Sequence, residues 1–149
     1  MFYILKTALK TLFTLNLINL CNPLALPRQS KPIVVLHGLE SSIEKMVPLC
    51  EWIEDNFNRK VINIEIGNGE KTSLYTPLPE QLTELCDTIY NNKALENGFD
   101  FIGISQGGLL ARGYVEQCND YPVYNLITLV SPHGGALMRD SVENKFMYT

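Results

Sequence analysis

Four short stretches of β-branched and aliphatic residues alternate with three longer stretches of helical periodicity, and this alternation most constrains the fold. The predicted strands are residues 32–36, 60–66, 99–104 and 124–130. Three helices are predicted. The first is capped by Ser41 or Ser42 and runs to about residue 57, and the other two span residues 80–92 and 106–117. Residues 67–79 are expected to form a polar loop. Strands joined in succession by helices form right-handed crossovers, so we expect an α/β fold with a parallel sheet and flanking helices.

The motif Gly103-Ile104-Ser105-Gln106-Gly107 lies between the third predicted strand and the third predicted helix. A G-x-S-x-G motif at a strand-to-helix turn predicts a nucleophile elbow, in which glycines on either side avoid Cβ clashes. The Ser105 hydroxyl would then project above the carboxyl edge of the sheet, where ligands of open α/β sheets bind. We therefore expect Ser105 to be a catalytic nucleophile with strained backbone, for example in the αL region. The alternative is an ordinary glycine–serine turn.

A second loop at the same edge follows the first strand and reads His37-Gly38-Leu39-Glu40. In α/β-hydrolases an H-G segment at this point supplies one N–H group of the oxyanion hole. We expect the N–H of Leu39 to join that of Gln106 in stabilising a developing oxyanion. His37 and Gly38 then form the oxyanion loop, and His37 is interpreted as a hydrogen-bonded loop residue and not as a base.

The segments around these loops resemble palmitoyl-protein thioesterases. The matching runs are 32–38, 63–67, 103–108, 115–118, 125–129 and 133–135, in the family's order. The resemblance implies an α/β-hydrolase fold and a lysosomal or secreted serine hydrolase that removes long-chain acyl groups from protein cysteines. The implied partners are S-acylated proteins or long-chain acyl thioesters. The family has Gly where this chain has Glu40, and a carboxylate there opposes a developing negative charge unless it points to solvent.

The cysteines fit one disulfide and one free thiol once Cys21 leaves with a signal peptide. The family resemblance implies that Cys86 pairs with Cys118 and that Cys50 stays free, the alternative being two separate buried thiols. No Cys-x-x-Cys spacing occurs and only two histidines are present, so no metal site or cofactor is expected. The formal net charge of −4 argues against nucleic acid as a partner.

Residues 1–26 are predicted to be a secretory signal peptide. Lys6 and Lys10 precede an apolar stretch with no acidic residue. Asparagines interrupt that stretch, so no stable membrane span is expected. The alternative is an amphipathic helix that the mature protein retains. Residues 27–149 are predicted to form a partial α/β-hydrolase domain in the secretory pathway, in lysosomes or outside the cell.

The catalytic acid and histidine are expected to be absent from this chain. In this fold the triad runs Ser, then Asp or Glu, then His, and His133 is the sole histidine after Ser105. Asp120 follows a 12-residue helix that would carry the chain about 18 Å from Ser105. We therefore expect a sheet truncated after the fourth recognisable strand. The alternatives are an inactive truncated paralogue, an acyl-binding remnant, or a generic lipase or esterase.

Overall fold

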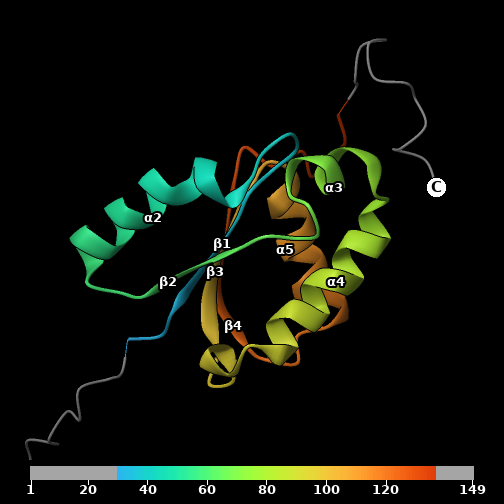
Figure 1. Cartoon of the computed structure of the whole chain (residues 1–149). Coiled ribbons are helices and arrows are strands. Elements are labelled where there is room, and N and C mark those ends of the chain that lie inside the picture. The colour runs from blue at the N-terminus through green and yellow to red at the C-terminus, as the bar shows by residue number, and fades with distance from the viewer. Residues whose placement is uncertain (1–29, 137–149) are drawn as a thin grey trace, which may run out of the picture.

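A parallel four-stranded sheet forms the centre of residues 30–136, the part of the chain that the computed structural model describes (Figure 1). The strand order is β2-β1-β3-β4. The strands are β1 (Ile33–Leu36), β2 (Val61–Ile64), β3 (Phe99–Ile104) and β4 (Val123–Leu129). The helices are α2 (Ile43–Phe57), α3 (Glu70–Tyr75), α4 (Leu78–Asn91) and α5 (Gln106–Gln117), with the 3-10 turn η1 (Lys93–Leu95). The predicted α/β fold, a parallel sheet with flanking helices, is confirmed.

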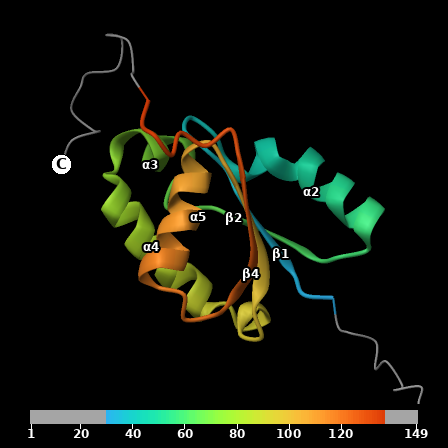
Figure 2. The same cartoon turned by 180° about the vertical axis from the view of Figure 1, so that it is seen from behind.

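Helices cover both faces of the sheet. Figures 1 and 2 show α2 on one face and α4 and α5 on the other. The chain passes from β1 through α2 to β2 and then returns through α3 and α4 to β3, on the opposite side of β1. The strand order therefore reverses at β1. In open α/β sheets, ligands bind outside the carboxyl ends of the strands at such a switch point.

The main core lies between the sheet and helices α4 and α5. The rings of Phe99, Phe101 and Tyr114 are fully buried and pack with centroids 5.5 to 6.1 Å apart. Burying a Phe side chain stabilises a fold by about 1.5–3 kcal/mol. The Tyr114 hydroxyl donates to the carbonyl oxygen of Tyr121 at 3.1 Å, and burial raises the pKa of this phenol. A smaller cluster, formed by Ile33, Val35 and Ile53, lies beneath α2.

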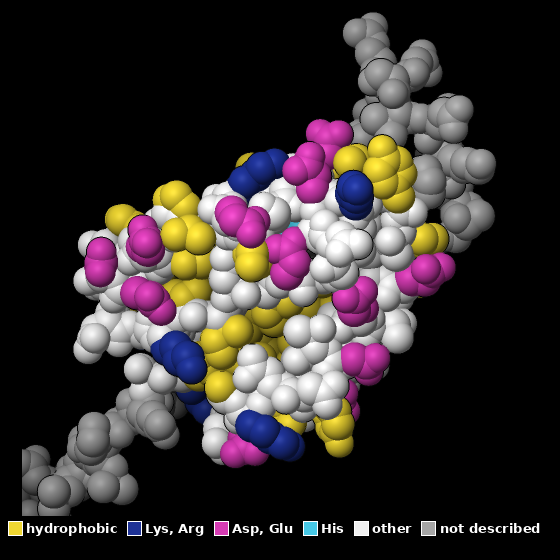
Figure 3. All heavy atoms as spheres, in the orientation of Figure 1, with side chains coloured by type: hydrophobic (Ala, Val, Ile, Leu, Met, Phe, Trp, Pro, Cys, Tyr) yellow, Lys and Arg dark blue, Asp and Glu magenta, His cyan; other side chains and the backbone are white. Residues whose placement is uncertain are grey.

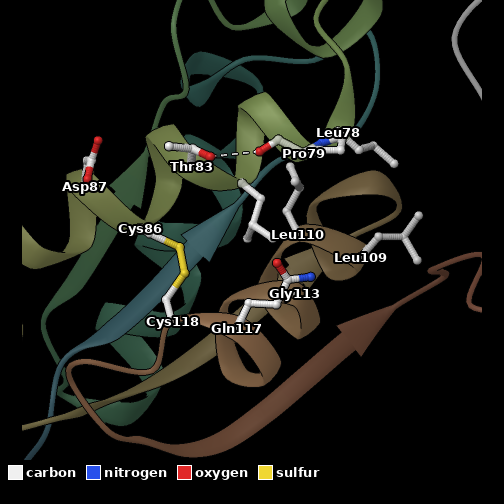
Figure 4. Close-up of a pocket in the computed structure, with 11 residues that line it drawn as sticks. Leu78, Pro79, Thr83, Cys86, Asp87, Leu109, Leu110, Gly113, Gln117 and Cys118 are labelled. Atoms are coloured by element: carbon white, nitrogen blue, oxygen red, sulfur yellow. Dashed lines mark hydrogen bonds between the residues drawn. A yellow bond between two sulfur atoms is a disulfide. The ribbon is translucent and has the colours of Figure 1, made fainter. Parts of the chain in front are cut away.

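A disulfide between Cys86 and Cys118 joins α4 to the end of α5, with Cα atoms 6.2 Å apart. The pairing that the family resemblance implied is thus confirmed. Figure 4 shows the disulfide at one end of a groove between the two helices, about 510 Å³ in volume. Neither Ser105 nor the loop 37–40 lines this groove. Cys50 on α2 is free, as predicted, and burial followed by repulsion from Glu54 raises the pKa of its thiol.

The prediction of a loop over residues 67–79 is wrong. This stretch contains α3, and α4 begins at Leu78 instead of residue 80. Gly67 and Gly69, with φ of 54° and 56°, form the turn that leads into α3. Pro79 lies in the first turn of α4, where a missing N–H removes no helical hydrogen bond. The six residues of α3 are too few for a helical period to appear in the sequence.

The surface in Figure 3 carries scattered acidic side chains, and hydrophobic side chains gather along α2 and in a hollow between α2 and α4.

The predicted signal peptide, residues 1–26, lies outside the described residues, as do both ends of the predicted domain over 27–149. Between residues 30 and 136 no helix is both long and apolar enough to cross a membrane.

Candidate active site

Ser105 lies at the turn between β3 and α5, at the carboxyl edge of the sheet. Its φ of 53° is positive, as predicted, but its ψ of −120° lies outside the αL region. Its N–H donates to the carbonyl oxygen of Leu129 at 2.8 Å, which ties the turn to the end of β4. A conformation of this kind costs about 1–3 kcal/mol and persists only where the surrounding structure holds it.

The glycines beside Ser105 allow three backbone segments to meet. A Cβ added to Gly103 would lie 2.5 Å from the Gly107 carbonyl oxygen, and one added to Gly107 would overlap the carbonyl oxygen of His37. A Cβ added to Gly38 would lie 2.7 Å from the Ile104 carbonyl oxygen and 2.8 Å from the Ser105 Cβ. A larger residue at Gly38 or Gly107 would push the loop 37–40 away from the Ser105 turn, and one at Gly103 would displace the first turn of α5. The register explains the proximity, because Leu36 at the end of β1 pairs with Gly103.

The loop 37–40, in which His37 and Gly38 were predicted to form the oxyanion loop, packs against this turn. His37 is 5% exposed, and its Nδ1 lies 2.8 Å from the Gly38 carbonyl oxygen. Nδ1 is therefore the donor of this hydrogen bond. Nε2 of His37 lies 3.5 Å from Oε1 of Glu65, which follows β2. Within residues 30–136 this buried Nε2 has no hydrogen-bond partner, so the hydrogen bond of His37 lies inside the loop 37–40 itself.

Glu65 also caps α2. Its Oε2 accepts the N–H of Ile43, the first residue of the helix, at 2.8 Å. Ser42 is the N-cap residue, one of the two positions predicted, but its side chain makes no cap hydrogen bond to the helix backbone. The Ser42 hydroxyl instead bonds to Glu44 and lowers the pKa of that carboxyl. A carboxylate at a helix N-terminus interacts favourably with the free N–H groups and the helix dipole.

The two predicted oxyanion-hole donors lie on either side of the Ser105 turn. Gln106 is the first residue of α5, where an N–H has no intrahelical acceptor. Leu39 is half-buried, and within residues 30–136 its N–H likewise makes no hydrogen bond. The next residue, Glu40, has φ 51°, its N–H donates to Ser73 Oγ at 3.0 Å, and its carbonyl oxygen accepts from Lys45 Nζ at 2.7 Å.

No base accompanies Ser105 in the part of the chain that the structure describes. His133 is exposed, and its Nε2 lies 3.0 Å from Oγ1 of Thr128. Nδ1 of His37 bonds to Gly38, and its buried Nε2 faces Glu65 without forming a hydrogen bond within residues 30–136. Asp120 follows the C-terminal end of α5, which is about 18 Å long and has Ser105 as its N-cap at the other end. Over residues 30–136, no histidine or carboxylate side chain therefore forms a hydrogen bond to the Ser105 hydroxyl.

Ser73 and Glu65 contribute to the site, although the sequence analysis assigned a role to neither. Ser73 is 4% exposed on α3 and contacts both Glu40 and Gln106. The one signal in the sequence was the Gly-Asn-Gly turn at 67–69, which begins two residues after Glu65 and leads the chain into α3.

Comparison with known proteins identifies the family. Residues 32–147 match the model of the palmitoyl protein thioesterase family. The chain belongs to this family. It is 40% identical to palmitoyl-protein thioesterase 3 of Dictyostelium discoideum over 113 residues, which are 75% of this chain and 39% of that protein. It is 30% identical to lysosomal thioesterase PPT2 of Homo sapiens over 107 residues, 70% of this chain and 35% of that protein.

A third relative extends the family to a fusion protein. The chain is 34% identical, over 70% of its own length, to a palmitoyl-protein thioesterase-dolichyl pyrophosphate phosphatase fusion of Schizosaccharomyces pombe, of which it covers 18%. The chain thus spans about two-fifths or less of the length of these curated relatives. The palmitoyl protein thioesterase match includes both the loop 37–40 and Ser105, and the α/β-hydrolase fold of the family agrees with the four-stranded sheet.

Proposed function

We propose that this chain provides the nucleophile and the oxyanion hole of a serine hydrolase that cleaves long-chain acyl thioesters on protein cysteines. The observation that carries the proposal is the conformation of Ser105, φ 53° and ψ −120°, at a strand-to-helix turn beside the loop 37–40. A strained serine at the N-terminus of a helix is the arrangement that exposes a nucleophile next to free N–H donors. Membership of the palmitoyl protein thioesterase family supports the acyl thioester as substrate class.

In the proposed reaction the Ser105 Oγ attacks the carbonyl carbon of the thioester, and its proton passes to a base. The carbonyl oxygen becomes an oxyanion, which the N–H groups of Leu39 and Gln106 stabilise. Collapse of this intermediate breaks the carbon–sulfur bond and releases the cysteine thiol, leaving an acyl ester on Ser105. Water then attacks the ester, and the fatty acid leaves as the serine hydroxyl is restored.

A second candidate function is the binding of long-chain acyl groups without turnover. The specific observation in its favour is that His37 and His133 both bond to groups other than Ser105. Without a base, a serine hydroxyl is a weak nucleophile. A generic lipase or esterase fits less well, because the family match runs over residues 32–147.

We further propose that the chain enters the secretory pathway through residues 1–26 and acts in lysosomes or outside the cell. Three observations support this location. The N-terminal sequence has the basic and apolar regions of a signal peptide, a disulfide joins Cys86 to Cys118, and the similar human protein is named a lysosomal thioesterase.

The decisive experiment is mass spectrometry of the full chain after incubation with a palmitoyl thioester. Without a base both acylation and deacylation are slow, so the incubation is long and contains imidazole, which is removed before analysis; the serine ester then persists, and we expect a palmitoyl adduct on the Ser105 peptide. Hydroxylamine at neutral pH distinguishes the two possible adducts, because it cleaves a thioester on Cys50 and leaves an ester on Ser105 intact. Ser105→Ala should abolish the adduct.

Ser131→Ala is the matched control, because Ser131 follows β4 at the same sheet edge and its Oγ bonds only to Leu129. This variant should retain the Ser105 adduct. An adduct that persists in Ser105→Ala contradicts the nucleophile assignment. Saturable binding of palmitate by both the parent chain and Ser105→Ala, with no adduct in either, would favour the acyl-binding function.

A further inference from the structure

Ser73 uses all of its polar groups to join three segments at the carboxyl edge of the sheet. Its Oγ accepts the N–H of Glu40 at 3.0 Å and donates to the Glu70 carbonyl oxygen at 2.8 Å. Its carbonyl oxygen accepts from the side-chain Nε2 of Gln106 at 3.0 Å. Its own N–H donates to Gly69 within the first turn of α3. With 4% of its surface exposed, Ser73 therefore lies between the loop 37–40 and the start of α5.

The helix that carries Ser73 is itself anchored at both ends. Before α3, the N–H of Gly67 donates to Glu84 Oε1 on α4 at 2.6 Å, and the N–H of Asn68 donates to Thr72 Oγ1 at 2.8 Å. After α3, Nε2 of the buried Gln81 donates to the Thr76 carbonyl oxygen at 2.6 Å. The position of Ser73 is consequently fixed relative to α4, and α3 acts as a rigid bridge and not as a free loop.

We propose that Ser73 is a positioning residue that sets the distance between the two oxyanion-hole donors, an inference that rests on the function proposed above. Its side chain fixes the peptide that follows Leu39, and its carbonyl fixes the side chain of Gln106. Donors in an oxyanion hole act only within about 2.7–3.1 Å of the oxyanion. A residue that holds both donor segments thus controls transition-state stabilisation without touching the substrate.

The hydrogen bond from the Glu40 N–H to Ser73 Oγ also explains how Glu40 keeps its strained backbone. With φ 51°, Glu40 lies in the region that favours glycine, and such a conformation persists when neighbouring contacts determine it. The N–H of Glu40 bonds to Ser73 and its carbonyl oxygen to Lys45. Lys45 is an exposed side chain on α2, so the buried Ser73 is the more rigid of the two partners.

The test is amide hydrogen exchange of the full chain by NMR, with Ser73→Ala and Thr72→Ala as matched variants. Each removes one hydroxyl that accepts a backbone N–H, but Thr72 bonds to Asn68 and not to the loop 37–40. Losing one hydrogen bond changes an opening equilibrium by roughly fivefold. We expect Ser73→Ala to speed exchange of the Glu40 amide by about this factor and to shift the Gln106 side-chain resonances. Thr72→Ala should affect Asn68 alone.

The exchange measurement needs no catalysis, so it separates this inference from the proposed function. Unchanged exchange at Glu40 in Ser73→Ala, or an equal increase in Thr72→Ala, would overturn the positioning role. Ser73→Thr keeps the hydroxyl and should retain slow exchange at Glu40. If Ser73→Ala does not fold, Ser73→Cys replaces it, because sulfur fills the site of the oxygen but accepts a hydrogen bond only weakly.

A kinetic measurement tests the consequence for catalysis. Where the parent chain acylates Ser105, Ser73→Ala should lower the maximal acylation rate and leave the half-saturating thioester concentration unchanged, since the donors act in the transition state. An increase in the half-saturating concentration alone would contradict the inference. Failure of the parent chain to acylate Ser105 would count against the proposed function, while the exchange result at Glu40 would still decide whether Ser73 holds the loop.

Discussion

Backbone strain at single residues is concentrated at the sheet edge that carries Ser105. Five non-glycine residues between positions 30 and 136 have positive φ. Asn58 and Asn119 follow helix ends, where asparagine adopts the left-handed region readily. Glu40, Ser105 and Val130 instead lie in the segments that follow β1, β3 and β4. Strained residues of this kind cluster at active sites, and here they share the edge where the strand order reverses.

Glu40→Gly should stabilise the protein. A non-glycine residue in the left-handed region costs about 1–2 kcal/mol, and the extra unfolded-state entropy of glycine offsets about half of that. The hydrogen bonds of Glu40 at this edge involve its backbone N–H and carbonyl oxygen, which glycine retains. We therefore expect the free energy of unfolding, measured by urea denaturation, to rise by up to about 1 kcal/mol.

Glu40→Ala separates backbone strain from charge. Alanine removes the carboxylate but keeps a Cβ at φ 51°, so the gain in unfolding free energy should be absent. Equal stabilisation by both substitutions would show that charge, and not the backbone, is responsible.

At the scale of secondary structure, the sequence predicted the elements that have a clear period and missed those that depend on distant contacts. The buried run of β1 and the periodic apolar residues of α4 and α5 were identified within a few residues. In contrast, α3 has six residues and is held by Glu84 and Gln81 from α4. The carboxylate that caps α2 comes from Glu65, 22 residues away from Ile43, so local patterns could not reveal it.

For the same reason the sequence predicted Ser105 and the glycines around it but not the role of Ser73. The G-x-S-x-G motif is local, and its meaning follows from the strand before it and the helix after it. Ser73 lies 33 residues from both Glu40 and Gln106. Its role depends on how α3 folds back over the sheet edge, which no motif in the sequence encodes.

The disulfide between α4 and α5 should contribute measurably to the free energy of unfolding. Cys86 and Cys118 are 32 residues apart, and closing a loop of this size stabilises a fold by about 3–4 kcal/mol in the chain-entropy model. We therefore expect the double variant Cys86→Ala/Cys118→Ala to lose about this much in urea denaturation. Cys50→Ala is the control, because Cys50 is free, and its loss should be smaller. A double variant as stable as the parent chain would contradict the prediction.

At the scale of the whole molecule, the described sheet has two edge strands, β2 and β4, of which β4 is the longer. Within residues 30–136, β4 pairs with β3 alone. The exposed fractions of Ile127, Leu129 and Val130 are 45%, 42% and 86%, and no charged residue occurs between positions 123 and 130. Long apolar edge strands promote association, and lysine on an edge opposes it.

We therefore predict that the full chain associates as its concentration rises and that Ile127→Lys suppresses this association. Size-exclusion chromatography with light scattering over a concentration series measures the effect. Val47→Lys, at a 42% exposed position on α2, adds the same charge away from β4 and should leave association unchanged. Equal suppression by both variants would point to net charge, and not to the strand edge, as the cause.

Within residues 30–136, the proposed nucleophile Ser105 and the two proposed N–H donors have no base hydrogen-bonded to the Ser105 hydroxyl, and this determines the expected activity. Removing the histidine of a serine hydrolase lowers kcat on the order of 10⁶-fold. The two histidines of the chain bond to Gly38 and Thr128. We therefore expect the 149-residue chain to hydrolyse a palmitoyl thioester near the background rate.

Added imidazole, as an external base, should raise the rate in the parent chain and not in Ser105→Ala. Rapid turnover without imidazole that Ser105→Ala abolishes would show that His133 or another group of the chain reaches Ser105. An imidazole effect of equal size in both proteins would mean that Ser105 is not the nucleophile.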